Sequence, residues 1–297
     1  MPRFLLTLLS FTLVLAMGCD PNANNPNGSG EPGALADDGD EDGDLLTNAF
    51  EISLGTDPEN ADSDGDGFDD AFEYAAFFKP WDDTDFPYAG GYARGPTPPG
   101  SRWDEITAED GWSQGDVSRS WTKTDRHGEV IKLKRFFGQV IMIDISAEWC
   151  GPCRQAASTL EAEWLDRVDD GFTVIQLMLD GMTPGDGNPQ LDRWANDFGL
   201  TIPIFADGDR GTTANYVPDG SWGIPMFAQI DRDFVIRQWD RSGSPAPFPE
   251  TDQYLAEDWS YADEADEWWP MPDNIDQIRT DLGFGDSMYR GYVEAMD

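Results

Sequence analysis

From residue 120 onward, runs of apolar residues alternate with segments in which apolar residues recur at helical spacing. The segments 139–146 and 172–179 are almost continuously apolar, which is typical of strands buried on both faces of a sheet. Shorter apolar runs predict further strands at 130–133, 202–206, 226–230 and 234–239. Helices are predicted at 152–168, at 190–199 and at 274–282. Strands that alternate with helices predict an α/β fold, in which a central mixed β-sheet is flanked by helices.

The amino-terminal third lacks this periodicity and begins with a different kind of segment. Arg3 is followed by an apolar run over 4–17 and by small Gly18 beside Cys19, which is the layout of a secretory signal. The run is too short for a membrane-spanning helix. It resembles a bacterial lipoprotein signal, and the resemblance implies lipid attachment to Cys19 and anchoring in the bacterial cell envelope, on the periplasmic or surface side. The alternative is an ordinary signal peptide in which Cys19 is incidental.

Charge is distributed unevenly along the chain. The formal net charge is -39, and residues 20–78 hold 17 acidic residues but no Lys or Arg. A nucleic-acid-binding surface needs clustered Lys and Arg, so nucleic acid is excluded as a partner. Solubility, mutual repulsion or cation binding remain as explanations for the acidity.

The acidic region contains two related segments, 40–51 and 62–73. In the second, carboxylates alternate along the loop, Gly67 stands at the sharp turn and an acid closes the segment, which is the spacing of a calcium-binding loop. The expected ligands there are Asp62, Asp64, Asp66, Phe68 through its backbone, Asp70 and Glu73. The weaker equivalents, with Leu45 in place of the glycine, are Asp40, Asp42, Asp44, Asn48 and Glu51. The pair resembles thrombospondin type 3 calcium repeats, which implies structural calcium. The alternative is a solvated acidic segment.

The motif WCGPC at 149–153 combines two cysteines with a predicted boundary between a strand and a helix. At a helix start, unpaired backbone N–H groups and the helix dipole favour a thiolate at Cys150, and Cys153 can then attack a mixed disulfide formed there. A zinc site would need about four ligands, whereas only Cys19 and His127 remain besides this pair. A structural bridge across so short a loop would constrain the unfolded chain only weakly. Redox chemistry is therefore the favoured interpretation.

The segment IDISAEWCGPCR, together with GIPMF at 223–227, resembles the active-site and cis-proline segments of the thioredoxin superfamily. The preceding residues 124–145 resemble the exported, membrane-anchored TlpA and ResA type within it. The resemblance implies a thiol-disulfide oxidoreductase with a redox-active disulfide and no cofactor for catalysis. It also implies disulfide-containing exported proteins as substrates, with apocytochrome c as the usual suggestion, a membrane electron donor, and action as a reductase.

The same resemblance assigns roles to individual positions. Cys150 would be the nucleophile and Cys153 the resolving thiol, and the bond before Pro225 is expected to be cis. The positions expected to contact substrate are Trp149, Gly151, Pro152, Ile224 and Pro225.

Asp144 matches the buried carboxylate that takes a proton from the resolving thiol in thioredoxin. Independently of the family, an acid in an apolar central strand is costly unless a raised pKa is useful. The alternative is a surface or hydrogen-bonded aspartate. Gln176 replaces the lysine that accompanies this acid in thioredoxin.

Three rival functions would require features other than a redox-active cysteine pair. A thiol peroxidase would need Thr or Ser three residues before its reactive cysteine, where this chain has Ala147. A catalytic triad would depend on His127, which lies in a predicted turn. A calcium-stabilised surface or adhesion lipoprotein, with a thioredoxin fold as a scaffold, would not need the intact cysteine pair.

The predicted organisation divides the chain into six parts: 1–18 signal peptide, 19–36 disordered tether, 37–78 calcium-binding repeats, 79–119 connector, 120–283 thioredoxin-like domain with an insertion at 241–272, and 284–297 tail. The aromatic residues of the connector are expected to pack on the next domain. The pair Trp268 and Trp269 is expected to cover either the sheet edge or the rim of the active site.

Overall fold

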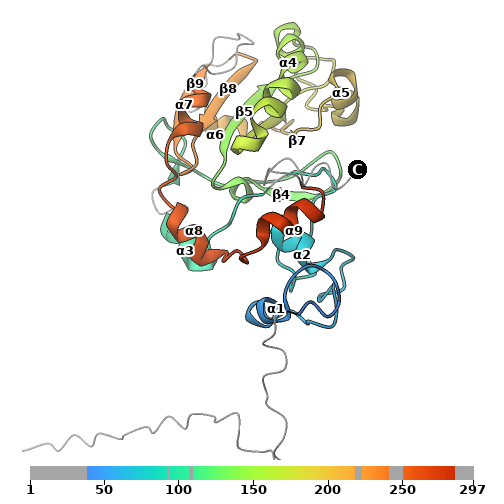
Figure 1. Cartoon of the computed structure of the whole chain (residues 1–297). Helices are drawn as coiled ribbons and strands as arrows, with labels where there is room; N and C mark the ends of the chain where they lie inside the picture. Colours follow the sequence, from blue (N-terminus) through green and yellow to red (C-terminus); the bar gives the residue numbers. More distant parts are fainter. Residues whose placement is uncertain (1–38, 93, 107–109, 218–222, 241–249, 285–297) are drawn as a thin grey trace, which may run out of the picture.

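A five-stranded mixed sheet forms the centre of the domain, as predicted (Figure 1). The strands lie in the order β7-β6-β5-β8-β9, in which β5 is parallel to β6 and antiparallel to β8. Every residue of β5 and β6 is buried, which explains the two continuous apolar segments. The strands are β5 (Val140–Ser146), β6 (Phe172–Met178), β7 (Ile204–Ala206), β8 (Met226–Ile230) and β9 (Ile236–Asp240).

Helices cover this sheet and begin or end where the sequence predicts. The long helix α4 (Gly151–Arg167) follows β5 directly, and α5 (Leu191–Phe198) ends at Gly199, whose φ of 64° is the left-handed conformation that glycine tolerates. Arg167, the last residue of α4, forms an ion pair of 2.7 Å with Asp252 of α7 (Thr251–Ala256), so the end of α4 lies near the start of α7. The remaining short elements are α6 (Thr213–Tyr216) and the 3-10 turn η2 (Val168–Asp170).

The carboxyl-terminal helices differ from the prediction. Residues 274–282 were expected to close the domain, yet α9 (Ile275–Asp281) packs against the acidic segment through α2 (Asp70–Ala75). The helix that contacts β5 is α7, inside the range expected to be an insertion, and Gln229 of β8 donates a 2.8 Å hydrogen bond to Thr251 at its start. At six residues, α7 is too short to show helical periodicity in the sequence.

The connector and the start of the domain fold into small elements at the edge of the main sheet. These are α3 (Gly100–Ile106), the paired strands β1 (Asp110–Gly111) and β2 (Val117–Ser118), the hairpin β3 (Thr122–Thr124) and β4 (Val130–Lys132), and the 3-10 turn η1 (Leu133–Phe136). Trp103 of α3 is buried, with its ring centroid 5.1 Å from that of Phe137 and 5.7 Å from that of Phe234. The expected packing of connector aromatics on the domain is therefore confirmed.

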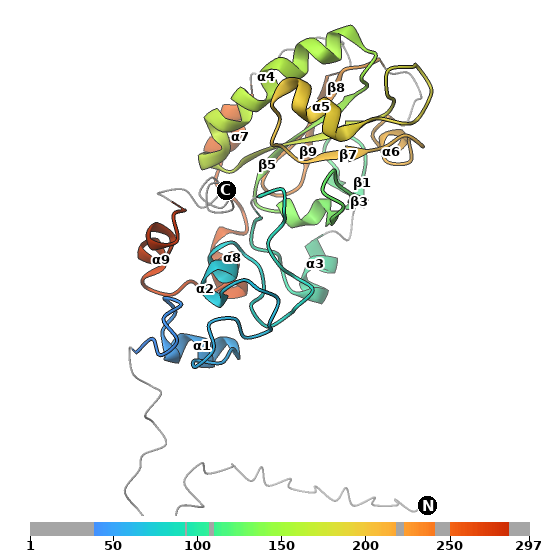
Figure 2. The same ribbon diagram turned by 90° about the vertical axis from the view of Figure 1, so that its right-hand side faces the viewer.

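The acidic segment packs against the carboxyl-terminal part of the chain (Figure 2). It contains α1 (Asn48–Leu54) and α2, and it meets α9 and the loop that joins α8 (Ala262–Trp268) to α9. Trp269 stacks on Tyr74 of α2 with ring centroids 4.8 Å apart, and its indole N–H donates a 3.1 Å hydrogen bond to the Tyr74 carbonyl. The Tyr74 hydroxyl in turn donates to the Pro270 carbonyl at 2.7 Å. Trp269 thus covers neither the sheet edge nor the active-site rim, because the ring of Tyr74 is its apolar partner.

The computed structural model describes residues 39–92, 94–106, 110–217, 223–240 and 250–284. The predicted signal peptide, the lipidation site Cys19, the tether and all but the first residue of the predicted tail lie outside this range. Within the described part of the chain, no helix is long and apolar enough to cross a membrane.

Candidate active site and acidic loops

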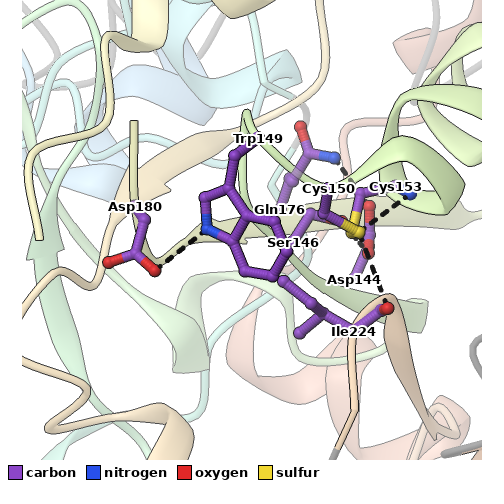
Figure 3. Close-up of a disulfide and its surroundings, with 8 residues drawn as sticks. All are labelled: Asp144, Ser146, Trp149, Cys150, Cys153, Gln176, Asp180 and Ile224. Atoms are coloured by element: carbon purple, nitrogen blue, oxygen red, sulfur yellow. Dashed lines mark hydrogen bonds between the residues drawn. A yellow bond between two sulfur atoms is a disulfide. The ribbon is translucent and has the colours of Figure 1, made fainter. Parts of the chain in front are cut away.

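The two cysteines of the WCGPC motif lie at the junction between β5 and α4 and form a disulfide (Figure 3). Their Cα atoms are 5.2 Å apart. Cys150 is the N-cap residue of α4, and the backbone N–H of Cys153 points to the Cys150 sulfur at 3.2 Å. Cys153 is fully buried and Cys150 is 3% exposed. In the reduced protein this N–H and the positive end of the helix dipole would stabilise a thiolate on Cys150 rather than on Cys153.

The loop before β8 faces the disulfide from the other side. The bond between Ile224 and Pro225 is cis, as expected, and the Ile224 carbonyl oxygen lies 3.6 Å from the Cys150 sulfur. A cavity of about 350 Å³ opens beside them and is lined by Trp149, Cys150, Gly151, Pro152, Leu179, Asp180, Arg210, Gly223 and Ile224. All but one of the predicted substrate-contacting residues therefore line one cavity. Pro225 does not line it, but follows Ile224 directly.

Asp144 lies in the middle of β5 and is completely buried. Its carboxylate accepts hydrogen bonds from the Ser146 hydroxyl at 2.7 Å and from the Gln176 side-chain amide at 2.6 Å. Burial raises the pKa of Asp144 from 3.8 to about 6, although these two hydrogen bonds act in the opposite direction. The oxygen of the Gln176 amide accepts from the Trp194 indole at 2.6 Å, which fixes the amide orientation. The partner of Asp144 on the neighbouring strand is therefore Gln176, a neutral hydrogen-bond donor.

A second carboxylate, Asp180, shapes the rim of the cavity, and the sequence analysis missed it. It accepts a 3.2 Å hydrogen bond from the Trp149 indole and two bonds of 2.9 Å from the Arg210 guanidinium. Burial acts to raise the pKa of Asp180, but hydrogen bonds from Gly185, Gly187, Trp149 and Arg210 outweigh it, and the pKa is lowered. Trp149 keeps 39% of its surface exposed. An anionic Asp180 therefore holds an exposed indole beside the disulfide.

A signal for Asp180 exists in the sequence. Asp180 follows the apolar strand 172–179, and the carboxyl ends of parallel strands meet at the same edge of a sheet. Since Cys150 follows the neighbouring parallel strand, an acid at this position belongs beside the motif. Arg210 gives no comparable signal, because it lies in a loop after β7 and reaches the site only through tertiary folding.

The loop 62–73 brings together the carboxylates predicted to bind calcium. Ligand oxygens of Asp62, Asp64 and Asp66 all lie within 4.8 Å of one another. Glu73 is fully buried, and neither of its oxygens accepts a hydrogen bond from the described residues. Burial, followed by the charges of Asp66 and Asp64, raises the pKa of Glu73 to about 10. Unpartnered carboxylate oxygens crowded in this way fit a hard divalent cation. Asp70, by contrast, accepts bonds from the Ser63 N–H and hydroxyl at 2.8 and 2.6 Å.

The loop 40–51 repeats this arrangement with one difference. Asp40, Asp42 and Asp44 form a second cluster of carboxylates, and fully buried Glu51 again has no hydrogen-bond partner among the described residues. Burial and neighbouring carboxylates raise the pKa of Glu51 to about 8. Leu45 occupies the turn with a φ of 91°, a conformation that costs a non-glycine residue energy. The turn therefore forms without its glycine, but under strain.

Asn48, the remaining predicted ligand in loop 40–51, makes other contacts. Its side-chain oxygen accepts from the Glu41 N–H at 3.0 Å, and its amide donates to the Glu41 carboxylate at 3.3 Å. Asp44 uses both oxygens to accept from the backbone of Leu46 and Ala71. The bond to Ala71 joins the first loop to α2, which begins within the second loop.

Comparison with known proteins identifies relatives of the domain that contains the disulfide. Residues 115–238 match the model of the AhpC/TSA family. The chain is 39% identical over 72 residues to a thioredoxin of Rhodospirillum rubrum, a match that covers 24% of this chain and 62% of that protein, slightly less than two thirds.

Two further relatives extend this comparison. A thioredoxin of Griffithsia pacifica is 32% identical over 94 residues, which cover 30% of this chain and 73% of that protein. The thiol-disulfide oxidoreductase ResA of Bacillus thuringiensis subsp. konkukian is 22% identical over 135 residues, covering 45% of this chain and 72% of that protein. The residues that match the AhpC/TSA family, 115–238, contain the disulfide and nearly all of the central sheet.

Proposed function

Because this chain belongs to the thioredoxin family, we propose that it is a thiol-disulfide oxidoreductase that reduces disulfides of exported proteins. One observation carries the proposal. The Cys150–Cys153 disulfide caps a helix beside a cavity, with the more exposed sulfur at the helix start and the other buried behind it. The similarity to a protein named as the thiol-disulfide oxidoreductase ResA supports this activity.

The reaction follows from the positions of the two sulfurs. In the reduced protein, the Cys150 thiolate attacks one sulfur of a client disulfide, and the other client sulfur leaves as a thiolate. Cys153 then loses its proton and attacks the Cys150 sulfur, which releases the second client thiolate and restores the Cys150–Cys153 disulfide. Two electrons pass to the client, and a membrane electron donor must return two electrons to the cysteines. Asp144, with its pKa raised by burial, accepts the proton of Cys153.

Client binding uses the surface around Cys150. The backbone of Ile224 lies next to the reactive sulfur and offers pairing groups to an extended client segment. The exposed indole of Trp149 supplies an apolar contact for residues that flank the client cysteine. These contacts involve only the client backbone and one apolar side chain. They therefore suit unfolded exported proteins that contain disulfides, including an apocytochrome c.

Lipid on Cys19 is proposed to anchor the protein in the bacterial cell envelope. The support is the order of charge, apolar run and small residue before Cys19. The polar residues 20–36 would then act as a tether between the membrane and the domain. Intact-mass measurement of membrane-extracted protein tests this idea, since an unmodified Cys19 would contradict it.

Calcium is proposed as a structural ion in the loop 62–73, with a weaker site at 40–51. Asp62, Asp64, Asp66 and Glu73 would hold the ion in the second loop, where it would neutralise carboxylates that otherwise repel one another. Calorimetric titration with CaCl2 tests the proposal. Absence of heat uptake or release at millimolar calcium would leave only a solvated acidic segment.

Insulin reduction with a dithiol donor tests the activity. Cys150→Ser should abolish turnover, whereas Cys153→Ser should accumulate a mixed disulfide between Cys150 and insulin. Cys19→Ser is the matched control, because it removes the remaining cysteine and leaves the redox pair intact. Full activity of the Cys150→Ser variant would disprove the assignment.

A further inference from the structure

A second cavity, of about 360 Å³, lies among the connector, the strand β4 with the turn η1, and the carboxyl-terminal extension. We call it the basic pocket because five cationic residues line it: Lys79, Arg94, Lys132, Lys134 and Arg135. The chain has only 19 Lys and Arg residues and a formal net charge of -39. It has four lysines in all, and three of them line this pocket. Such a concentration of positive charge runs against the composition of the whole molecule.

The two arginines of the basic pocket already have an anionic partner. Asp85 is 5% exposed and accepts hydrogen bonds from Arg94, at 2.7 Å, and from Arg135. Burial acts to raise the pKa of Asp85, but the two guanidinium groups outweigh burial and lower it. This carboxylate is therefore ionised, and it neutralises one of the two arginine charges. The arginines fix the shape of the pocket, and with Asp85 they leave one net positive charge beside it.

The three lysines have no such partner. Within the described part of the chain, the one lysine that forms an ion pair is Lys123, with Asp207, and it lies outside the pocket. The Lys134 ammonium lies 5.5 Å from the centre of the Trp103 ring. Burial lowers the pKa of Lys134. The positive charges of Lys132, Arg135 and Lys79 lower it further, whereas the charge of Asp104 acts to raise it. The three lysines thus line one cavity, and within the described residues none of them forms an ion pair with an acid.

Aromatic rings form an apolar wall of the same pocket. Trp81 is 45% exposed and stacks against Trp269, with ring centroids 6.3 Å apart and planes inclined by 27°. Trp269 is buried and anchored to Tyr74, so it gives Trp81 a fixed support. Trp268 also lines the pocket. An exposed ring on a rigid support next to cations suits a ligand that has an anionic group and an apolar body.

The type of cation indicates the type of anion. Arginine binds carboxylates and phosphates through two parallel hydrogen bonds from its planar fork, but both arginines here already donate to one oxygen of Asp85. Lysine acts as a compact point charge and commonly binds phosphate. We propose that the basic pocket binds a phosphate group carried by a molecule with an apolar body, either a phospholipid headgroup or a soluble phosphate ester.

The basic pocket is separate from the redox site. Lys134 and Arg135 belong to η1, which precedes β5, whereas the disulfide follows the other end of β5. Seven residues of strand span about 20 Å, since each residue rises about 3.3 Å. A ligand in the basic pocket would leave Cys150 accessible. If that ligand is a lipid headgroup, it would orient the domain with the disulfide directed away from the membrane.

Calorimetric titration of the full chain with phenyl phosphate tests the proposal. The wild-type protein should bind it saturably, and sodium benzoate, which has the same ring with a carboxylate, should bind at least about tenfold more weakly. The double variant Lys132→Gln/Lys134→Gln should lose at least about tenfold in affinity for phenyl phosphate. Lys123→Gln is the matched control, because it removes the lysine outside the pocket and should bind as the wild type does. Circular dichroism and the Tm of thermal unfolding check that each variant is folded.

Sedimentation with lipid vesicles distinguishes the two sources of phosphate. Binding to phosphatidylglycerol vesicles that is lost in the double variant, but kept in Lys123→Gln, identifies a headgroup site. Binding of phenyl phosphate alone identifies a soluble ester. The proposal is overturned if the wild type binds neither probe, if benzoate binds as tightly as phenyl phosphate, or if the folded double variant binds like the wild type. None of these outcomes depends on the redox assignment.

Discussion

Replacing Asp144 by Asn should stabilise the protein at neutral pH, although it removes one of the two carboxylate oxygens that accept hydrogen bonds in the core. Burial raises the pKa of Asp144 from 3.8 to about 6. The folded protein therefore keeps a proton on this group between about pH 4 and pH 6, where the unfolded chain has lost it. Across that window the free energy of unfolding falls as pH rises, and above it the loss is constant.

The size of the effect follows from the shift. About two pKa units at 1.36 kcal/mol each amount to roughly 3 kcal/mol. The Asn side chain has one oxygen and one nitrogen where the carboxylate has two oxygens. Because Trp194 fixes the orientation of the Gln176 amide, the site cannot adapt fully to this change. We therefore expect the loss of one hydrogen bond, which costs about 1 kcal/mol. We expect Asp144→Asn to raise the free energy of unfolding by about 2 kcal/mol at pH 7.5. Near pH 4 the contribution from the pKa shift should vanish, and the cost of the lost hydrogen bond, about 1 kcal/mol, should remain.

Urea unfolding of the disulfide-bonded protein at both pH values measures this difference. Asp266→Asn is the control, since it removes one negative charge from an exposed position of α8 and should change stability by less than about 0.5 kcal/mol. Equal effects of Asp144→Asn at pH 7.5 and pH 4 would refute the reasoning, as would destabilisation at pH 7.5. Either result would mean that the buried carboxylate is not strained by ionisation.

Three further predictions concern other parts of the molecule. Asp180→Asn should release the Trp149 indole and raise KM for insulin several-fold, while the redox potential of the dithiol stays unchanged. An unchanged KM would show that the indole does not contact the client. Glu73→Gln should reduce the rise in Tm that millimolar calcium produces over EGTA in scanning calorimetry, whereas exposed Glu59→Gln should not. Trp269→Ala should lower the free energy of unfolding in urea by about 3–5 kcal/mol without loss of insulin reduction, and a change below about 1 kcal/mol would contradict its role in the interface.

The central sheet and the disulfide site could be predicted because local patterns determine them. The strand β5 is apolar at almost every position, and the motif that follows it contains its own helix start, so the order along the chain was enough to place Cys150. The cis bond before Pro225 followed from a short motif. These features depend on residues close together in the sequence.

Features that depend on distant contacts were not predictable in the same way. The sequence predicted that α9 would pack on the sheet, but α7 does so instead. This was not predictable because α7 is short, and because the amphipathic α9 packs its apolar side on α2. Arg210 reaches the cavity from a loop without periodicity. The basic pocket combines lysines from segments that are far apart, and no window of sequence contains its pattern.

The stacking of Trp269 on Tyr74 joins two residues that lie 195 positions apart in the sequence. A nascent polypeptide therefore cannot complete the surroundings of α2 until the segment that contains Trp269 has been synthesised. The ribosome adds that segment long after the acidic loops, so the packing of α2 is completed late.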